Sequence, residues 1–175
     1  MITKDNTLKV MELFFKCPEG KFHIREVGRL TGLSMPGARK ILAKLEKEGL
    51  LLSKSENMVK NFYAARNEKF MSLKRAYNIH SVFASGLLDF LKGKYQEPEA
   101  IILFGSYSKG DDISKSDIDI AIITPKRGLQ DLSRFEKGLG RKIRIYEVRI
   151  RGMEPEFLNS LANGIVLYGY LKVVG

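Results

Sequence analysis

The sequence has a single cysteine and no long hydrophobic run. Cys17 excludes an internal disulfide, and the apolar residues beside it at 13–15 indicate a buried thiol rather than a reactive one. No stretch approaches the roughly 18 consecutive apolar residues that a membrane-spanning helix requires. The first residues, 1–5, lack the apolar segment of a signal peptide. We therefore expect a soluble, cytoplasmic protein with no membrane partner.

Histidine is nearly absent as well. His23 and His80 stand far apart in the sequence, and no cluster of cysteine and histidine surrounds either of them. Because a structural zinc site needs several such side chains close together, neither histidine is expected to bind a metal. Both are expected at the surface or at a helix cap, and His23 directly precedes a predicted helix.

Acidic residues are scarce in one half of the chain only. The net charge is +10, and residues 1–95 hold 18 lysines and arginines against 9 acids, whereas residues 96–175 hold 12 against 11. A basic half indicates polyanion binding, although a solvated basic surface without a partner has the same composition. The length of 175 residues suits one domain or two small ones.

The basic half has the pattern of three helices and a hairpin. Apolar residues recur at helical spacing over 7–16 and 24–30, and a third helix is expected after the tight turn that ends at the capping Ser34. Two short β-prone runs, 50–52 and 59–64, then flank a polar tip.

This order of elements resembles the winged helix-turn-helix DNA-binding domains of prokaryotic regulators, and residues 24–34 and 41–50 carry the resemblance. It implies a recognition helix in the major groove of double-stranded DNA and a wing on phosphate or in the minor groove. The recognition-helix residues would be Ser34, Met35, Gly37, Arg39, Lys40 and Lys44. The wing residues would be Lys54, Asn57 and Lys60. Cations on one helix face release counterions from a duplex, and a protein-docking module with a solvated basic helix is the alternative.

Residues 67–95 contain no proline and predict a long amphipathic helix. Its apolar stripe consists of Phe70, Leu73, Tyr77, Ala84, Leu87, Leu88 and Leu91. The stripe is interrupted near 80–81, which argues against a long coiled coil. The helix would connect two domains or form the seam of a homodimer that reads two half-sites. The expected division is a winged helix at 1–66, a connecting helix at 67–97 and a second domain at 98–175.

The second half alternates strands and helices. Strands are expected at 100–104, 118–124, 142–150 and 164–171, and helices at 129–138 and 154–163. A turn at Gly105 and Ser106 follows the first strand, and Asp117 and Asp119 come after ten more residues. Because alternate residues of a strand point to the same side, the two carboxylates converge beside the turn. Such an arrangement suits Mg²⁺ and the phosphates of a nucleotide.

The Gly-Ser turn with its Asp-x-Asp strand resembles the minimal nucleotidyltransferases of the DNA polymerase β-like superfamily, over residues 99–170. The resemblance implies that the whole chain is α+β, with a winged helix-turn-helix, a long connecting helix and a mixed sheet with flanking helices. Gly105, Ser106 and Lys109 would bind ATP or another nucleoside triphosphate. The catalytic residues would be Asp117 and Asp119, which bind the Mg²⁺ that neutralises charge on the leaving pyrophosphate.

One position departs from the pattern of this family. The family supplies a third carboxylate from the next strand, where this sequence has Arg144. Glu147 is the only acid on that strand, and by alternation it lies on the opposite face with Ile143 and Ile145, unless a bulge shifts the register. An arginine beside two carboxylates could replace a metal by ion pairing, which would leave a nucleotide-binding or structural domain.

Two functions are therefore open. The first is a DNA-associated enzyme that transfers a nucleoside monophosphate to a hydroxyl, with a partner protein as one candidate acceptor, as in toxin–antitoxin pairs where a HEPN-type toxin is adenylylated. The second is a winged-helix transcriptional regulator whose impaired transferase domain senses a ligand or mediates oligomerisation. The complete Gly-Ser and Asp-x-Asp motif favours the enzyme, and Arg144 favours the regulator.

Overall fold

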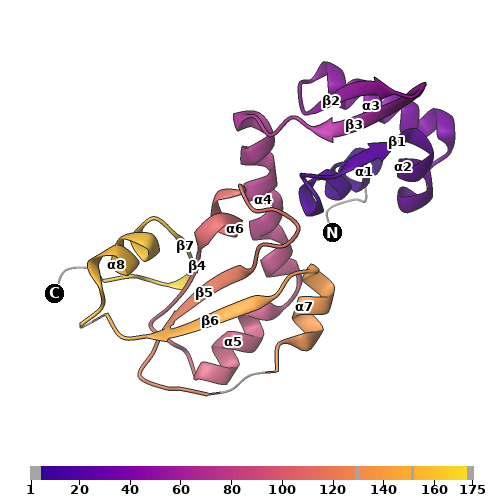
Figure 1. Ribbon diagram of the computed structural model, residues 1–175. Helices are drawn as coiled ribbons and strands as arrows, with labels where there is room; N and C mark the ends of the chain where they lie inside the picture. The colour runs from indigo at the N-terminus through magenta and orange to yellow at the C-terminus, as the bar shows by residue number, and fades with distance from the viewer. Residues whose placement is uncertain (1–4, 129–130, 151, 173–175) are drawn as a thin grey trace. The chain divides into compact units, whose positions relative to one another are not determined.

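Figure 1 shows the computed structural model, which describes residues 5–128, 131–150 and 152–172. The chain divides into two compact units, Met1–Lys74 and Arg75–Gly175, and each is considered by itself. The expected α+β architecture is confirmed, with helices and a hairpin in the first unit and a mixed sheet in the second. No helix among the described residues is long and apolar enough to span a membrane.

The first unit contains three helices and a three-stranded antiparallel sheet of order β1-β3-β2. Its elements are α1 (Asn6–Lys16), β1 (Lys21–His23), α2 (Ile24–Thr31), α3 (Met35–Lys47), β2 (Leu51–Glu56) and β3 (Val59–Ala64). The predicted three helices and hairpin are confirmed. The strand β1 was not predicted, because three residues offer no alternation to detect and this strand forms by pairing with β3.

Side-chain caps explain where the helices of the first unit begin. Asp5 accepts a hydrogen bond from the Thr7 N–H at 2.9 Å and caps α1. The Nδ1 atom of His23 accepts from a backbone N–H at 3.2 Å, so this histidine caps α2 as expected. Ser34 caps α3 by accepting from the Gly37 N–H at 3.3 Å. Each of these helices therefore begins at a capping residue that can be recognised from the neighbouring sequence.

The connecting segment forms two helices, α4 (Glu68–Ala84) and α5 (Leu87–Tyr95), instead of the single helix predicted over 67–95. Gly86 separates them with a φ of 74°, a left-handed conformation that ends an α-helix. The hydroxyl of Ser85 forms hydrogen bonds with backbone groups on both sides of the break. The correction has a local cause, because Ser-Gly competes with the helical hydrogen bonds.

The second unit is built on a four-stranded mixed sheet of order β6-β5-β4-β7. Its strands are β4 (Ala100–Phe104), β5 (Ile118–Ile123), β6 (Ile143–Val148) and β7 (Ile165–Gly169), and its further helices are α6 (Gly105–Lys109), α7 (Ser133–Leu139) and α8 (Pro155–Ala162). Strand β4 is antiparallel to β5 and β7, whereas β5 and β6 are parallel. The start of the predicted helix at 129–138 lies outside the described residues.

Strand alternation gives this sheet two different faces. Ile118, Ile120 and Ile122 pack in one buried cluster with residues of α5 and α7. Ala121 and Ile123 pack on the other side, with residues of α8. Figure 1 shows α8 apart from α5 and α7 beside the sheet. Since Asp119 alternates with Ile118 and Ile120, it lies on the face that α8 partly covers.

A buried polar cluster holds the loop that leads from α6 to β5. The side chain of Asp112 is fully buried and pairs with Arg141 at 3.3 Å. Asn78 donates one hydrogen bond to Asp112 at 2.8 Å and another to the carbonyl oxygen of Tyr107 at 2.9 Å. Arg141 also donates to the carbonyl oxygen of Ser114. The cluster therefore fixes the loop that carries the chain to Asp117.

We predict that Arg141→Met destabilises the second unit by about 3–5 kcal/mol, because it leaves a buried carboxylate without its guanidinium. Denaturant unfolding followed by circular dichroism measures this loss. The control is Lys142→Met, which removes an exposed ion pair with Glu136 and should cost less than about 1 kcal/mol. Equal losses of unfolding free energy in the two variants would show that the buried pair stabilises the unit no more than the exposed pair does.

Candidate functional site

The end of β4 and the start of β5 bring Gly105 and Asp119 together. Phe104 and Asp119 are direct partners in the antiparallel pair, and Gly105 follows with a φ of 73°. A Cβ atom on Gly105 would lie 2.7 Å from the Oδ2 atom of Asp119. Glycine is therefore required here both by its backbone conformation and by the approach of the carboxylate.

Arg144 occupies the position next to the two aspartates. The parallel register of β5 and β6 sets Asp119 opposite Arg144. The Nη2 atom of Arg144 lies 2.6 Å from the Oδ2 atom of Asp117, and the Arg144 side chain is 65% exposed. The hydroxyl of Tyr146 donates to the Oδ1 atom of Asp119 at 3.3 Å. A hydrogen bond with Tyr146, followed by the charge of Asp117, raises the pKa of Arg144.

Glu147 lies on the other face of the sheet, as the alternation predicts. Its Oε1 atom accepts from the hydroxyl of Tyr95 at 2.6 Å and from the Gly128 N–H at 2.9 Å. These contacts join β6 to α5 and to the chain after β5. Glu147 therefore has a structural role and does not supply the missing carboxylate.

These residues do not fit the three-carboxylate metal centre that the family resemblance implies. Asp117 already has a guanidinium on one oxygen, and Arg144 stands where the third carboxylate would be. Among the residues that the structure describes, no three side chains of histidine, cysteine, aspartate or glutamate converge on one point. Asp117, Asp119 and Arg144 form instead a mixed-charge group in which one cation stands beside two carboxylates.

The other predicted nucleotide contacts lie on the short helix α6. Ser106 is half-buried, and Lys109 is exposed at the end of the helix. Gly105 and Lys109 both line a cavity of about 440 Å³ that extends to α8. Helix α6 was expected as a turn, and it has no side-chain cap within the described chain.

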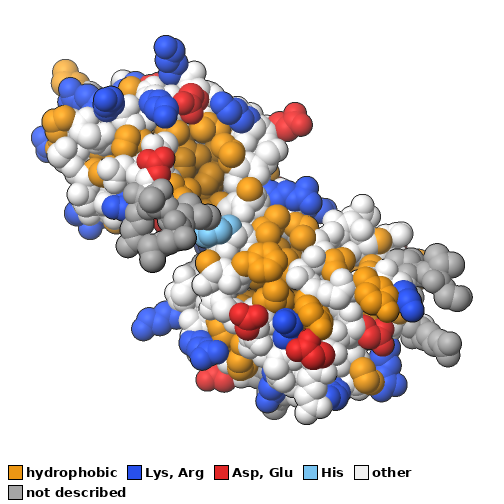
Figure 2. All heavy atoms as spheres, turned by 180° about the vertical axis from the view of Figure 1, so that it is seen from behind, with side chains coloured by type: hydrophobic (Ala, Val, Ile, Leu, Met, Phe, Trp, Pro, Cys, Tyr) orange, Lys and Arg blue, Asp and Glu red, His pale blue; other side chains and the backbone are white. Residues whose placement is uncertain are grey.

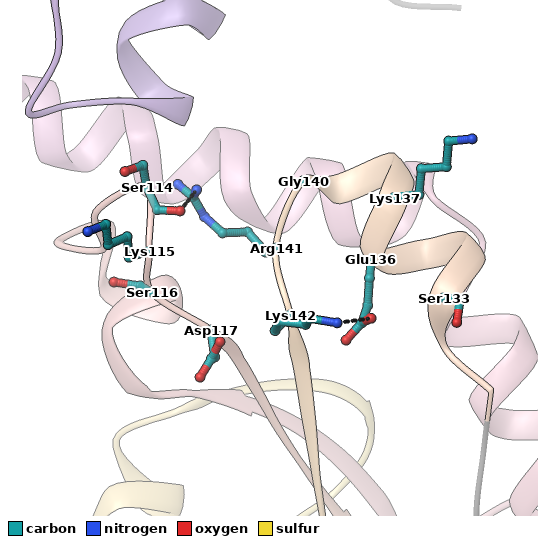
Figure 3. A pocket seen from close by; sticks show the side chains of 10 residues that line it. All are labelled: Ser114, Lys115, Ser116, Asp117, Ser133, Glu136, Lys137, Gly140, Arg141 and Lys142. Atoms are coloured by element: carbon teal, nitrogen blue, oxygen red, sulfur yellow. Dashed lines mark hydrogen bonds and ion pairs between the residues drawn. The ribbon is translucent and has the colours of Figure 1, made fainter.

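A second cavity, of about 660 Å³, borders Asp117 on the side of α7 (Figure 3). In Figure 3 Lys142 points to Glu136 and Arg141 points to Ser114. The Lys142 Nζ atom lies 3.2 Å from Glu136, whose pKa is lowered first by the N–H of Ile143 and then by this lysine. Much of the charge around this cavity is thus neutralised within the protein.

Lys115 lines this second cavity and is not among the residues that line the cavity beside Gly105. Tyr146 was not predicted as a site residue. Its position two residues after Arg144 on the same strand nevertheless places both side chains on one face of the sheet. Asn159 of α8 and Asn163 at its C-cap, which line the first cavity, were missed as well, because no motif marks them.

Some of the predicted DNA-binding residues are exposed at the surface of α3, and others form ion pairs within the first unit. Arg39 and Lys40 are exposed on α3, and Met35 is 40% exposed at its start. Lys60 lies 2.9 Å from Glu46 of α3 and above the ring of Phe62, so its charge is engaged. Figure 2 shows lysine and arginine side chains spread over the first unit beside an apolar area.

The remaining predicted DNA contacts have local partners. Lys44 lies 3.9 Å from Glu48, and Lys54 lies 3.4 Å from Glu56. These ion pairs are exposed and therefore weak enough to exchange for phosphate contacts. Asn57 is exposed at the hairpin tip with a φ of 49°.

The second unit is similar to a known protein family. Residues 87–170 match the family model described as polymerase beta, nucleotidyltransferase. The curated proteins contain no match to the chain.

Several solved structures are similar to part of the chain. The homodimeric winged helix-turn-helix DNA-binding domain of Mb0332 from Mycobacterium bovis, a possible ArsR-family transcriptional regulator, is 19% identical, with 51% of this chain and 76% of that chain covered and a TM-score of 0.38. A variant of ZitR from Lactococcus lactis is 16% identical, with 50% and 60% covered and a TM-score of 0.39. The DNA-binding protein Sso10a-2 from Sulfolobus solfataricus is 28% identical, with 51% and 92% covered and a TM-score of 0.35. Residues 87–170 are thus similar to the nucleotidyltransferases of the polymerase beta family, and the first unit that precedes them consists of three helices, a three-stranded sheet and the start of α4.

Proposed function

We propose that this chain is a DNA-binding regulator whose nucleotidyltransferase domain binds a nucleoside triphosphate as a signal instead of transferring it. The observation that carries the proposal is the contact of 2.6 Å between Arg144 and Asp117. It neutralises one of the two carboxylates on which the transfer reaction of this family depends.

The charges around Gly105 favour binding of phosphate over its transfer. Arg144 offsets the charge of Asp117, and Tyr146 gives Asp119 a hydrogen bond. Without such partners, two carboxylates beside a triphosphate would repel it strongly. Lys109 adds an exposed cation on α6. The site thus has donors for phosphate, and a cation occupies the position where the transfer reaction would need a third carboxylate.

The first unit supports DNA as the partner. Arg39, Lys40 and Lys44 are exposed on α3, the helix that would enter the major groove. The excess of basic residues in this half of the chain agrees with a polyanion. Binding to two half-sites would require a homodimer, which we include in the proposal.

Transfer to a hydroxyl is the second candidate, and the packing of Asp119 on Gly105 favours it. In that reaction an acceptor oxygen, on a partner protein or nucleic acid, forms a bond to the α-phosphorus while the bond to pyrophosphate breaks. The acceptor proton leaves to solvent or to a carboxylate. Because Arg144 is 65% exposed, its side chain has room to move away from Asp117.

For nucleotide binding, we expect the full chain to bind ATP or another nucleoside triphosphate even with a chelator present. Ser106→Ala should weaken this binding about tenfold, since it removes a hydroxyl donor to a charged oxygen. Isothermal titration calorimetry measures both proteins, with the exposed Ser72→Ala as the matched control. The proposal fails if the wild-type chain binds none of the four nucleotides, or if Ser72→Ala weakens binding equally.

For transfer, we expect no labelling of partner proteins, nucleic acid or the chain itself from α-labelled nucleotides and Mg²⁺. Arg144→Asp supplies a third carboxylate and should produce measurable transfer or pyrophosphate exchange. The double variant with Asp117→Asn is the control and should be silent. Labelling by the wild-type chain that Asp117→Asn abolishes would instead establish the second candidate.

For DNA binding, we expect affinity for duplex DNA to fall steeply with salt. Replacing Arg39 and Lys40 by alanine should reduce the slope of log K against log salt by about 1–2, since each phosphate contact contributes about 0.9. Fluorescence anisotropy over a salt series measures the slope. The control replaces Lys126 and Arg127, an exposed pair in the other unit. Identical slopes in the two double variants would contradict a role for α3.

A further inference from the structure

We propose that the cavity between α6 and α8 holds the nucleoside of the bound nucleotide, and that Asn159 and Asn163 select its base. This inference rests on the proposed nucleotide binding and deepens it. The cavity measures about 440 Å³. That volume lies within the range of roughly 300–1,000 Å³ that is usual for small-molecule sites.

The cavity is continuous with the candidate phosphate site through one residue. Gly105 lines the cavity, and the carboxylate of Asp119 lies against the same glycine. Lys109 also lines the cavity, and it is the only charged residue among the described residues that line it. A triphosphate at Gly105 and Ser106 would therefore have a largely uncharged chamber beside it, which suits a sugar and base.

The far wall of the cavity consists of hydrogen-bonding side chains from the end of α8. Asn159, Ser160 and Asn163 line it. The Asn163 Nδ2 atom donates to the carbonyl oxygen of Asn159 at 2.8 Å. This hydrogen bond assigns the nitrogen of the amide to the side that faces the backbone. Its Oδ1 atom is then left as an acceptor. The Asn159 side chain is exposed and offers both a donor and an acceptor.

Packing beneath α8 holds the backbone that carries these two exposed asparagines. The ring of Phe157 lies 5.5 Å from that of Phe104, and Leu161 is almost completely buried on the same sheet face. Directly after Asn163, a Cβ atom on Gly164 would lie 2.8 Å from the side chain of Ile102. The chain thus passes close to β4 at this point. A rigid support of this kind is what a selective polar contact needs.

The chemistry of the wall indicates which bases fit. A fixed amide oxygen accepts a hydrogen bond from an exocyclic amino group, which adenine and cytosine carry and uracil lacks. An asparagine amide can also contact adenine through a donor and an acceptor together. We therefore infer a preference for ATP over UTP, with adenine as the favoured base.

The test is calorimetric titration of the full chain with ATP, UTP and inorganic tripolyphosphate. We expect the wild-type chain to bind ATP at least about fivefold more tightly than UTP. Asn159→Ala and Asn163→Ala should each weaken ATP about tenfold and remove the preference, while tripolyphosphate affinity stays within about twofold. The matched control is Glu156→Ala, an exposed position of α8 that does not line the cavity and should change nothing.

The possible results separate the two levels of the proposal. Equal wild-type affinity for ATP and tripolyphosphate overturns the nucleoside site and leaves the phosphate site standing. Unchanged ATP affinity in both asparagine variants overturns it too, as does an equal loss of ATP and tripolyphosphate, which would report damage to the phosphate site. If the wild-type chain binds none of these three ligands and neither of the other two nucleoside triphosphates, the proposed function itself fails and this inference falls with it.

Discussion

The parallel register of β5 and β6 governs the chemistry that the second unit can perform. It sets Arg144 opposite Asp119 and within reach of Asp117, so a cation stands among groups that would otherwise bind one. A shift of one residue would turn Arg144 to the buried face and bring Ile143 or Ile145 beside the aspartates. The ion pair is therefore a consequence of strand pairing, and the mixed charge of the site depends on it.

Two further constraints support this arrangement from outside the strands. The buried pair of Asp112 and Arg141 anchors the loop that leads into β5, and it therefore fixes the position of Asp117 at the end of that loop. Gly105 allows the chain to leave β4 directly against the carboxylate of Asp119. Any side chain at Gly105 would displace that carboxylate. The candidate site is thus built by close backbone approach and by one buried charge pair, while its own side chains remain partly exposed.

Much of the fold was predictable because its signals are local. The caps at His23 and Ser34 and the alternation of β5 and β6 follow from neighbouring residues, and the structure agrees with them. The break at Gly86 was missed although its Ser-Gly signal is also local, because the lack of proline and the apolar stripe over residues 67–95 were given more weight. The strand β1 and the wall of asparagines on α8 had no local signal, since both depend on partners distant in the sequence.

The sequence by itself determined the basic character of the first half of the chain and the Gly-Ser and Asp-x-Asp motif of the second half. It also showed that Arg144 stands where a carboxylate is expected. Only the tertiary structure decided that this arginine contacts Asp117, that Glu147 bonds to Tyr95 on the opposite face, and that α8 closes a cavity beside Gly105. The physical reason is that motif spacing specifies which residues share a strand face, whereas charge pairing and cavities arise between segments that only folding brings together.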